Sequence, residues 1–174
     1  DDDRTMIGKG MPDWTFGLNL GFEWKGLDFN MLLQGQAGAQ AFNVTRRTDL
    51  YYINLPKTIL NRWTGEGTSN TQPKFEFASA NDNYRSSDLW VEDGSFLRAR
   101  NVQLGYTLPQ KWTKKFFVQR LRIYAQAENL FTLTKYTGCD PEVTGGNGFS
   151  SDLGVDRGVY PQSRTFSVGV NLNF

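Results

Sequence analysis

The chain has 174 residues, a formal net charge of +1, 14% aromatic residues and a mean hydropathy of −0.51. No run of about 18 apolar residues occurs, which excludes a transmembrane helix, and the balanced charge without a dense basic cluster predicts no nucleic-acid partner. The chain has no histidine and a single cysteine, Cys139, which excludes Ser-His-Asp catalysis, an intrachain disulfide and zinc sites built on imidazole or paired thiolates.

Residues 14–24 alternate strictly between apolar side chains at even positions and Thr, Gly, Asn or Glu at odd positions. Because successive strand residues point to opposite faces, this pattern predicts a two-faced strand. The dipeptide at 25–26 is Lys-Gly, which predicts a tight turn. The alternation resumes over 27–38 with the apolar side chains at odd positions, so we expect an antiparallel hairpin.

Trp14 and Trp24 stand at the two ends of the first predicted strand. Their separation spans about 33 Å along a strand, and a tilt of about 40° projects this to about 25 Å, the height of the apolar band of an outer-membrane barrel. Strands of soluble sandwiches are usually only about 5–6 residues long. The pattern therefore favours a transmembrane β-strand with Trp14 and Trp24 in the aromatic membrane girdle.

Three more strands follow a long segment without sustained alternation. Residues 42–94 are rich in Gly, Asn, Ser and Thr, with one short helix predicted near 56–62, and they are typical of the extracellular loop of a barrel. The later strands are predicted at 96–108, 120–132 and 164–174, with a second extracellular loop at 134–163. The connections then run tight, long, short and long, which places turns and loops on opposite sides of a membrane.

Arg98 and Arg100 interrupt the strand at 96–108, because both share the phase of its apolar side chains. An arginine at the bilayer midplane costs about 2–4 kcal/mol. We therefore expect this end of the strand to lie above the hydrocarbon.

The strand at 164–174 ends on Phe174, after apolar residues at 166, 168, 170 and 172. A terminal strand that ends on Phe resembles the signal read by the barrel-assembly machinery, which can dock on an open strand edge by β-augmentation. Phe174 is therefore the predicted assembly signal, and an aromatic side chain there also suits a membrane interface.

The polar faces of the predicted strands carry amides and one tyrosine. These groups suit the hydroxyls and amides of a sugar or a peptide, but contact with water or with a plug domain would explain them equally, since every such lumen is polar. The candidate lumen-facing residues are Asn19, Asn30, Gln34, Gln36, Asn101, Gln103, Tyr124, Gln126 and Asn171.

No catalytic constellation emerges, and the sequence predicts no enzyme, no metal site and no cofactor. Glu23 and Asp28 flank the tight turn, where polar groups of a barrel rim are expected rather than the fixed carboxyl pair of a glycosidase. Four carboxylates of the second loop offer oxygen ligands to calcium, but their spacing does not match an EF-hand. These carboxylates are Asp140, Glu142, Asp152 and Asp156.

Several stretches resemble, in the right order, the C-terminal end of the SusC/RagA family of TonB-linked (TonB-dependent) outer-membrane transporters of Bacteroidetes. The resemblance implies a barrel of about 22 strands, of which this chain supplies about the last five, and a plug domain absent from this chain. The stretches are IGKGMPDWTFGLNLGFEWKGLDFNMLLQGQAG at 7–38, NRWTGEG at 61–67, DGSFLRARNVQLGYTLP at 93–109, LRIYAQAENLFTLTKYTGCDPEV at 121–143 and DRGVYPQSRTFSVGVNLNF at 156–174.

The resemblance also implies a function and partners. We expect uptake of oligosaccharides or peptides across the cell outer membrane. The implied partners are the remaining strands and plug of the same transporter, a SusD-like surface lipoprotein, the TonB complex, the barrel-assembly machinery and membrane lipid. Five strands alone would leave two open edges in lipid, so this chain is expected to be one part of a longer or split protein. Two alternatives stay open, namely a soluble all-β ligand-binding module and an outer-membrane receptor of the same fold without import.

Overall fold

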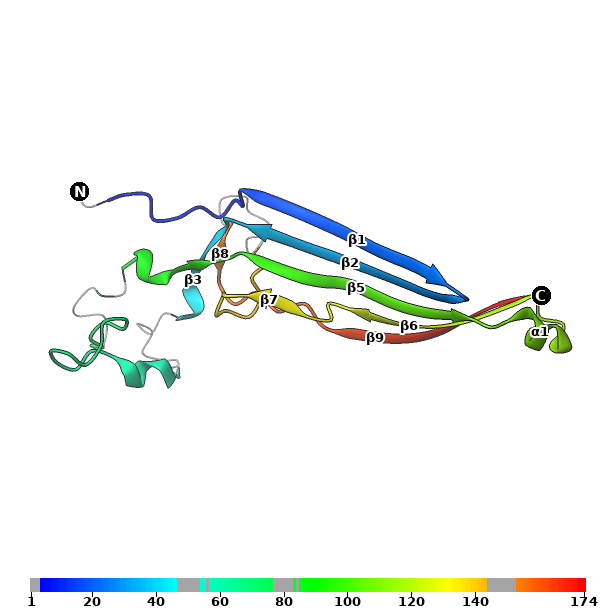
Figure 1. The fold of residues 1–174 in the computed structure, drawn as a ribbon. Coiled ribbons are helices and arrows are strands. Elements are labelled where there is room, and N and C mark those ends of the chain that lie inside the picture. Colours follow the sequence, from blue (N-terminus) through cyan, green and yellow to red (C-terminus); the bar gives the residue numbers. More distant parts are fainter. Residues whose placement is uncertain (1–3, 47–53, 56, 77–82, 84, 144–152) are drawn as a thin grey trace.

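The computed structural model describes residues 4–46, 54–55, 57–76, 83, 85–143 and 153–174. The fold is all-β, as predicted, and is dominated by one long antiparallel sheet of order β1-β2-β5-β6-β9, with β7 beside β5 (Figure 1). The strands of this main sheet are β1 (Trp14–Trp24), β2 (Leu27–Ala37), β5 (Phe96–Thr107), β6 (Arg120–Glu128), β7 (Thr132–Thr134) and β9 (Thr165–Asn173). Within the described ranges, no helix is long and apolar enough to cross a membrane.

The turn between β1 and β2 has the backbone that a two-residue hairpin requires. Lys25 and Gly26 both have positive φ, at 48° and 88°, which is the signature of the turn whose twist matches the flanking strands. A Cβ on Gly26 would lie 2.6 Å from the carbonyl oxygen of Thr107, and Thr107 donates its N–H to the Gly26 carbonyl at 2.7 Å. Glycine is therefore needed both for the turn and for the approach of β5.

A second, smaller sheet of order β4-β3-β8 forms at the opposite end of the main sheet from this turn. It lies in segments for which the sequence analysis predicted only long loops at 42–94 and 134–163. Its strands are β3 (Gln40–Asn43), β4 (Val91–Asp93) and β8 (Val155–Asp156), accompanied by the 3₁₀ helices η1 (Val44–Arg46), η2 (Lys57–Asn61) and η4 (Asp88–Trp90). Helix η2 falls within the predicted helix at 56–62, of which residue 56 lies outside the described residues.

The apolar phase assigned to Arg98 and Arg100 was wrong, because a β-bulge changes the phase of β5; the expected position of this strand end above the hydrocarbon stays a prediction. Asn101 pairs with Leu32, but Ala99 pairs with the next residue, Leu33, so that Arg100 is the extra residue. A bulge of this kind moves the following side chains to the other face. Arg98 therefore lies opposite Gln34 on the polar face of the sheet and is buried rather than exposed among apolar side chains.

The strand predicted at 120–132 also ends earlier than expected. β6 stops at Glu128, and Asn129 adopts a left-handed backbone with φ 50°. The N–H groups of Asn129 and Leu130 then bond to the carbonyls of Arg100 and Ala99, which are the residues of the bulge. The segment between β6 and β7 thereby stays hydrogen-bonded to β5 at the bulge, and β7 then pairs with β5 in the regular way.

Nearly all the buried side chains of the described residues lie at the small-sheet end of the molecule, with Thr113 of the connection between β5 and β6 an exception at the other end. Asn43 and Asp156 are the largest side chains that are fully buried, and Ala41, Tyr136 and Val143 form one packed cluster beside them. Between β1 and β9, many side chains on both faces of the main sheet are exposed. The functional question is therefore what each face contacts.

Candidate functional site

One face of the main sheet is apolar across its whole width. The register of the strands pairs the apolar residues of each strand with apolar residues of its neighbour, as the alternation predicts. One complete row consists of Phe22, Phe29, Leu104, Ala125 and Val168, and the two phenylalanine rings stack with centroids 5.3 Å apart. Val168 is 80% exposed. A contiguous apolar surface of this kind marks contact with lipid or another protein rather than with water.

The opposite face carries a connected network of polar side chains. Arg122 of β6 forms an ion pair with Asp28 of β2, with one nitrogen–oxygen distance of 2.9 Å, and it also donates to the Gln103 side chain at 3.1 Å. Gln103 donates to Gln126 at 3.2 Å, and Gln126 donates to Glu128 at 3.1 Å. The network therefore spans three strands and holds the polar side chains in fixed positions.

All nine candidate lumen-facing residues lie on this polar face. Asn30, Gln103 and Gln126 are direct neighbours across β2, β5 and β6. Asn19 and Asn101 lie on either side of Leu32, the one apolar residue of this row. The remaining four are Gln34, Gln36, Tyr124 and Asn171. Their contact with a lumen or a ligand stays a prediction.

The amides nearest the small sheet contribute to the scaffold. Gln34 accepts a hydrogen bond from Arg100 at 3.0 Å, and Gln36 donates to the Gly94 carbonyl at 3.1 Å. Sequence reasoning had not singled out Asp28 and Arg122 as site residues. In the sequence, each of the two is a charged residue on the polar face of an alternating strand. Only the register of the strands shows that the two side chains are close enough to pair.

Two glycines make space on the polar face. A Cβ on Gly105 would lie 2.5 Å from the Arg122 guanidinium and 2.6 Å from the Asp28 carboxylate, so the ion pair requires glycine there. The Tyr124 ring lies over Gly169, where any Cβ would overlap its atoms, and the Arg122 guanidinium is 4.9 Å from the centre of that ring. Gly105 and Gly169 thus let bulky side chains lie flat on the sheet.

Replacing Gly169 by valine is expected to lower the free energy of unfolding by about 1–3 kcal/mol, the usual cost of overpacking. The added side chain forces the Tyr124 ring off the sheet. The measurement is urea unfolding of the full-length protein. In a Tyr124→Ala background the same valine has space, so the cost should disappear, and a cost that persists there would show that the ring is not the cause.

Arg98 forms the centre of an ion-pair cluster at the small-sheet end of β5. It donates to Asp140 at 2.6 Å, to Glu142 at 3.0 Å and to the Thr132 hydroxyl at 2.9 Å. Arg100 donates to the second oxygen of Glu142 at 2.5 Å. The Arg98 and Asp140 side chains are only 3% and 4% exposed. The cluster therefore fixes the segment after β7 on the polar face of β5.

Glu92 joins the small sheet to its surroundings. It accepts hydrogen bonds from Asn43 at 3.2 Å, from Arg46 at 2.9 Å and from the Thr137 N–H at 2.8 Å. Burial by itself would raise the pKa of Glu92, but the bonds from Thr137, Arg46 and Asn43 outweigh it and lower the pKa. With a further bond from the Thr137 hydroxyl at 2.8 Å, four donor groups hold Glu92 as a carboxylate at the small sheet.

The loop carboxylates that were weighed as calcium ligands, and for which no metal site was predicted, have protein partners in the described part of the chain. Asp156 accepts a 2.5 Å hydrogen bond from the Tyr136 hydroxyl and further bonds from the N–H groups of Gly158 and Val159. Burial, followed by this contact with Asp156, raises the pKa of Tyr136. Asp140 is paired with Arg98, and Asp152 lies outside the described residues. The oxygens of Asp140 and Asp156 are thus used to shape the fold.

The ion pair of Asp140 is expected to weaken in acid. Burial by itself raises its pKa, but the N–H groups of Gln162 and Glu142 and the Arg98 guanidinium outweigh it and hold the pKa below the usual 3.8. A lowered pKa stabilises the fold above pH 3.8, and this contribution is lost as the pH falls through the folded value. The difference in urea midpoint between the full-length protein and an Asp140→Asn variant should be largest well above pH 3.8, near about pH 6, and shrink as the pH falls below 3.8. A difference independent of pH would contradict this.

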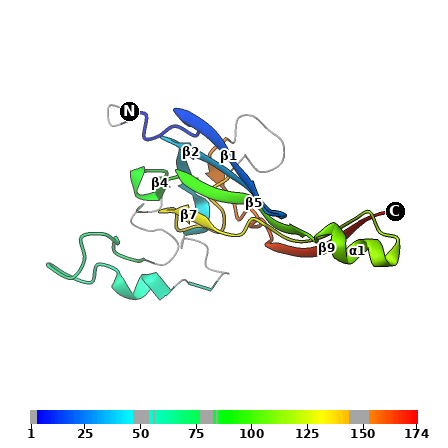
Figure 2. The ribbon, with the colours of Figure 1, turned by 45° about the vertical axis from the view of Figure 1, so that its right-hand side comes forward.

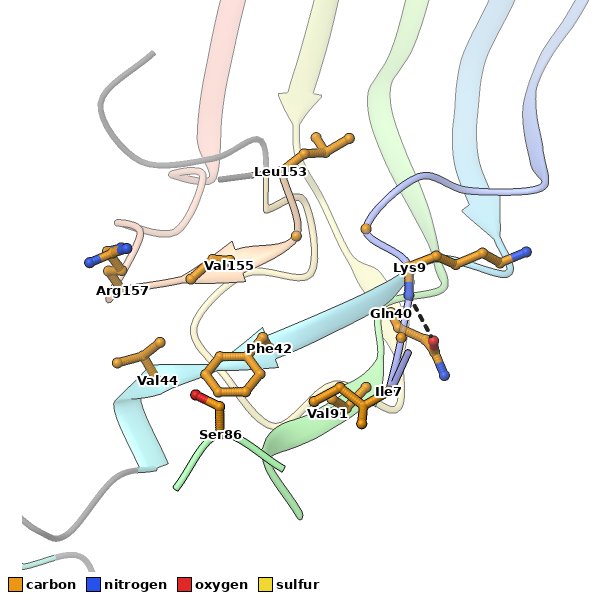
Figure 3. Close-up of a pocket in the computed structure, with 13 residues that line it drawn as sticks. Ile7, Lys9, Gln40, Phe42, Val44, Ser86, Val91, Leu153, Val155 and Arg157 are labelled. Atoms are coloured by element: carbon orange, nitrogen blue, oxygen red, sulfur yellow. Dashed lines mark hydrogen bonds between the residues drawn. The ribbon is translucent and has the colours of Figure 1, made fainter. Parts of the chain in front are cut away.

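A cavity of about 490 Å³ lies between the small sheet and the segment before β1 (Figure 3). The segment is fixed by hydrogen bonds between Lys9 and Gln40, one of them from the Lys9 N–H to the Gln40 side chain at 3.0 Å. The wall combines apolar side chains with two cations, and its labelled residues are Ile7, Lys9, Gln40, Phe42, Val44, Ser86, Val91, Leu153, Val155 and Arg157. The Lys9 ammonium is paired with Asp13, so the part of the wall that can contact a ligand is largely apolar.

The remaining predicted residues lie at the ends of strands. Trp14 and Trp24 are the first and last residues of β1, and both rings are exposed on the apolar face. Phe174 follows β9 and is also exposed. Their roles in the membrane girdle and in barrel assembly stay predictions.

No family model matches the chain. Among curated proteins it is similar to TonB-dependent receptor P3 of Formosa agariphila, with 33% identity over 177 residues, covering 99% of this chain and 17% of the receptor. It is similar also to TonB-dependent receptor SusC of Bacteroides thetaiotaomicron, with 26% identity over 174 residues, 99% of this chain and 16% of SusC. The chain therefore spans about one sixth of the length of these relatives.

Solved structures of the RagAB peptide importer resemble the fold. In the "closed-closed" state the similarity covers 97% of this chain and 18% of the solved chain, with a TM-score of 0.75 and 28% identity. In the "open-open" state it covers 94% and 17%, with a TM-score of 0.72 and 28% identity. Sequence and structure agree, and the chain is thus homologous along nearly its whole length to TonB-dependent receptors of the SusC/RagA type.

Proposed function

We propose that this chain is the C-terminal part of the β-barrel of a SusC-like TonB-dependent transporter, which imports nutrients across the cell outer membrane. The observation that carries the proposal is the main sheet, which has one apolar and one polar face across five long strands. Such a sheet suits a barrel wall with lipid outside and a polar lumen inside. The relatives are named as receptors and importers, so we propose no enzymatic role.

The proposed orientation follows from the two ends of the sheet. The small sheet with its long connections would lie at the extracellular end, and the tight turn after β1 would lie at the periplasmic end. The predicted strands and the loops at 42–94 and 134–163 fit this arrangement. The missing parts of the transporter would then be the plug domain and the other strands of a barrel of about 22 strands.

The proposed cargo is an oligosaccharide or a peptide. RagAB is described as a peptide importer, and the amide-rich polar face can bond to the hydroxyls of a sugar as well as to peptide groups. The partners we propose are a SusD-like surface lipoprotein, the TonB complex acting through the N-terminal part, and the barrel-assembly machinery. The nine amide and tyrosine residues named above are proposed to face the lumen.

The alternative with support of its own is a receptor of the same fold without import, because the curated relatives are named receptors. A soluble binding module fits less well, since it would leave the apolar face in water.

The test is uptake by cells. A strain lacking the full-length gene should fail to accumulate one labelled oligosaccharide or peptide from a panel, and a protonophore should abolish uptake by the parent strain. A tagged full-length receptor should also bring a surface lipoprotein with it in detergent. Ligand binding at the cell surface without accumulation would support the receptor alternative and contradict import.

A further inference from the structure

The connection between β5 and β6 is a short helical segment beyond the end of the main sheet. It contains α1 (Gln110–Thr113) and the 3₁₀ helix η5 (Lys114–Phe116). Figure 2 shows α1 beside the C-terminal end of β9, and the Gln119 N–H bonds to the Asn173 carbonyl at 2.8 Å. The connection therefore sits at the same end as the turn after β1, which the proposed function places in the periplasm.

Three aromatic side chains of this connection are exposed to solvent, namely Trp112, Phe116 and Phe117. Trp112 and Phe116 are four residues apart and share one face of the helical segment. Phe117 has a left-handed backbone with φ 61°, and its ring is 90% exposed. A bulky residue rarely adopts this conformation, and strain of this kind is typical of binding sites. Packing within the described chain does not explain why an aromatic ring is presented there.

The same connection is strongly basic. The connection itself, residues 108–119, contains three lysines and no acidic side chain, and Arg120 and Arg122 follow at the start of β6. Arg122 is paired with Asp28 on the polar face, while Lys111, Lys114 and Lys115 of the connection are exposed. Aromatic residues and lysines occur together in the sequence KWTKKFF at 111–117, which is the composition of segments that lie in a membrane interface.

A small apolar cavity of about 220 Å³ opens between the connection and the sheet. Its only polar lining residue is Thr113, whose hydroxyl is turned to the Gln110 carbonyl at 3.4 Å. Leu121, another lining residue, pairs with Leu172 on the apolar face of the main sheet. The full lining is Leu108, Trp112, Thr113, Phe116, Val118 and Leu121. The cavity is thus continuous with the surface proposed to face lipid, and it is smaller than the roughly 300–1,000 Å³ of a site for a drug-sized ligand.

We infer that this connection is a binding site for an anionic phospholipid of the adjoining leaflet. One part of an acyl chain lies in the cavity, against the rings of Trp112 and Phe116. The ammonium groups of Lys111, Lys114 and Lys115 reach the phosphate of the headgroup, since long basic side chains extend from apolar surface to the interface. Charge complementarity and continuity with the apolar face select this occupant over a protein partner. The inference rests on the membrane placement under the proposed function.

The experiment uses the delipidated full-length receptor in a neutral detergent. Short-chain phosphatidylglycerol is titrated against it, and native mass spectrometry counts the bound lipid. We expect Lys111→Gln/Lys114→Gln/Lys115→Gln to weaken phosphatidylglycerol binding at least tenfold, with little change for phosphatidylcholine. Lys57→Gln, an exposed lysine at the other end of the molecule, is the matched control and should bind as the parent does.

Phe117→Gly provides a variant whose fold is safe, because glycine adopts the left-handed backbone without strain. We expect it to weaken lipid binding several-fold, because the exposed Phe117 ring would contact the acyl chains beside Phe116, while the urea midpoint stays unchanged or rises. Equal phosphatidylglycerol binding by the parent and the triple lysine variant would overturn the inference, as would displacement of the lipid by inorganic phosphate alone. A receptor absent from the outer-membrane fraction would instead contradict the proposed function.

Discussion

Leu20→Arg is expected to lower the free energy of unfolding of the full-length receptor by about 2–4 kcal/mol, the cost of an arginine on the lipid face near the midplane. Leu20 lies near the middle of β1, and it pairs with Met31 on the apolar face. The arginine would have to keep its charge in hydrocarbon or distort the strand. The measurement is urea unfolding in bilayers, together with the amount of receptor that reaches the outer membrane.

Asn19→Arg is the matched control, one residue away on the same strand. Its side chain lies on the polar face, between two glycines at positions 17 and 21. We expect a loss below about 1 kcal/mol there, as for substitutions in a lumen. Equal losses for the two variants, or a larger loss for Asn19→Arg, would contradict the assignment of the faces.

Arg98→Met is expected to cost about 3–5 kcal/mol, because removing one member of a buried ion pair leaves the other charge without compensation. Asp140 loses its cation, and Glu142 loses one of two. The segment around them should detach from β5. Hydrogen exchange should show this directly, since the N–H groups of Glu142 and Gln162 both bond to Asp140 and should lose protection.

Two variants separate the lost ion pair from a general disturbance of the loops. Arg46→Met breaks a pair with Glu92 in which the Arg46 side chain is partly exposed, so we expect a cost of about 1 kcal/mol or less. Arg98→Met/Asp140→Leu removes both charges and should recover much of the loss. A double variant as unstable as Arg98→Met alone would show that the pair is not the source of the effect.

Local alternation was sufficient to predict the long strands and their two faces. The segment at 14–24 has the same bounds in the sequence analysis and in the structure, and the turn after it follows from a Lys-Gly pair. The all-β antiparallel fold was confirmed for the same reason, because the period of two is repeated over ten or so residues in each strand.

The small sheet and the bulge depend on contacts between distant residues. β3 pairs with β4 about fifty positions later and with β8 more than a hundred positions later, and none of the three strands is long enough to show a period. The bulge at Arg100 is invisible in the sequence, because the same residues read as a strand with two misplaced charges. The two arginines are accounted for only in the folded chain, where Arg98 pairs with Asp140 and Arg100 pairs with Glu142.

The sequence predicted which residues form the polar face but not which of their side chains bond to one another. The amides at polar-phase positions share one face, but the ion pair between Asp28 and Arg122 joins strands whose residues are 94 positions apart. Register is set by the bulge and the turns together. The register of the strands therefore cannot be predicted from a single sequence.

The central claim is that the apolar face contacts lipid and the polar face does not. The most direct test is spin labelling along β9 in the full-length protein, with all native cysteines, Cys139 among them, replaced by serine, reconstituted in bilayers. Labels at Phe166, Val168 and Val170 should be accessible to oxygen dissolved in the lipid. Labels at Thr165, Ser167 and Asn171, on the polar face, should show low oxygen accessibility, so that the signal alternates with a period of two. Equal access of a water-soluble relaxation agent to both sets would contradict the account.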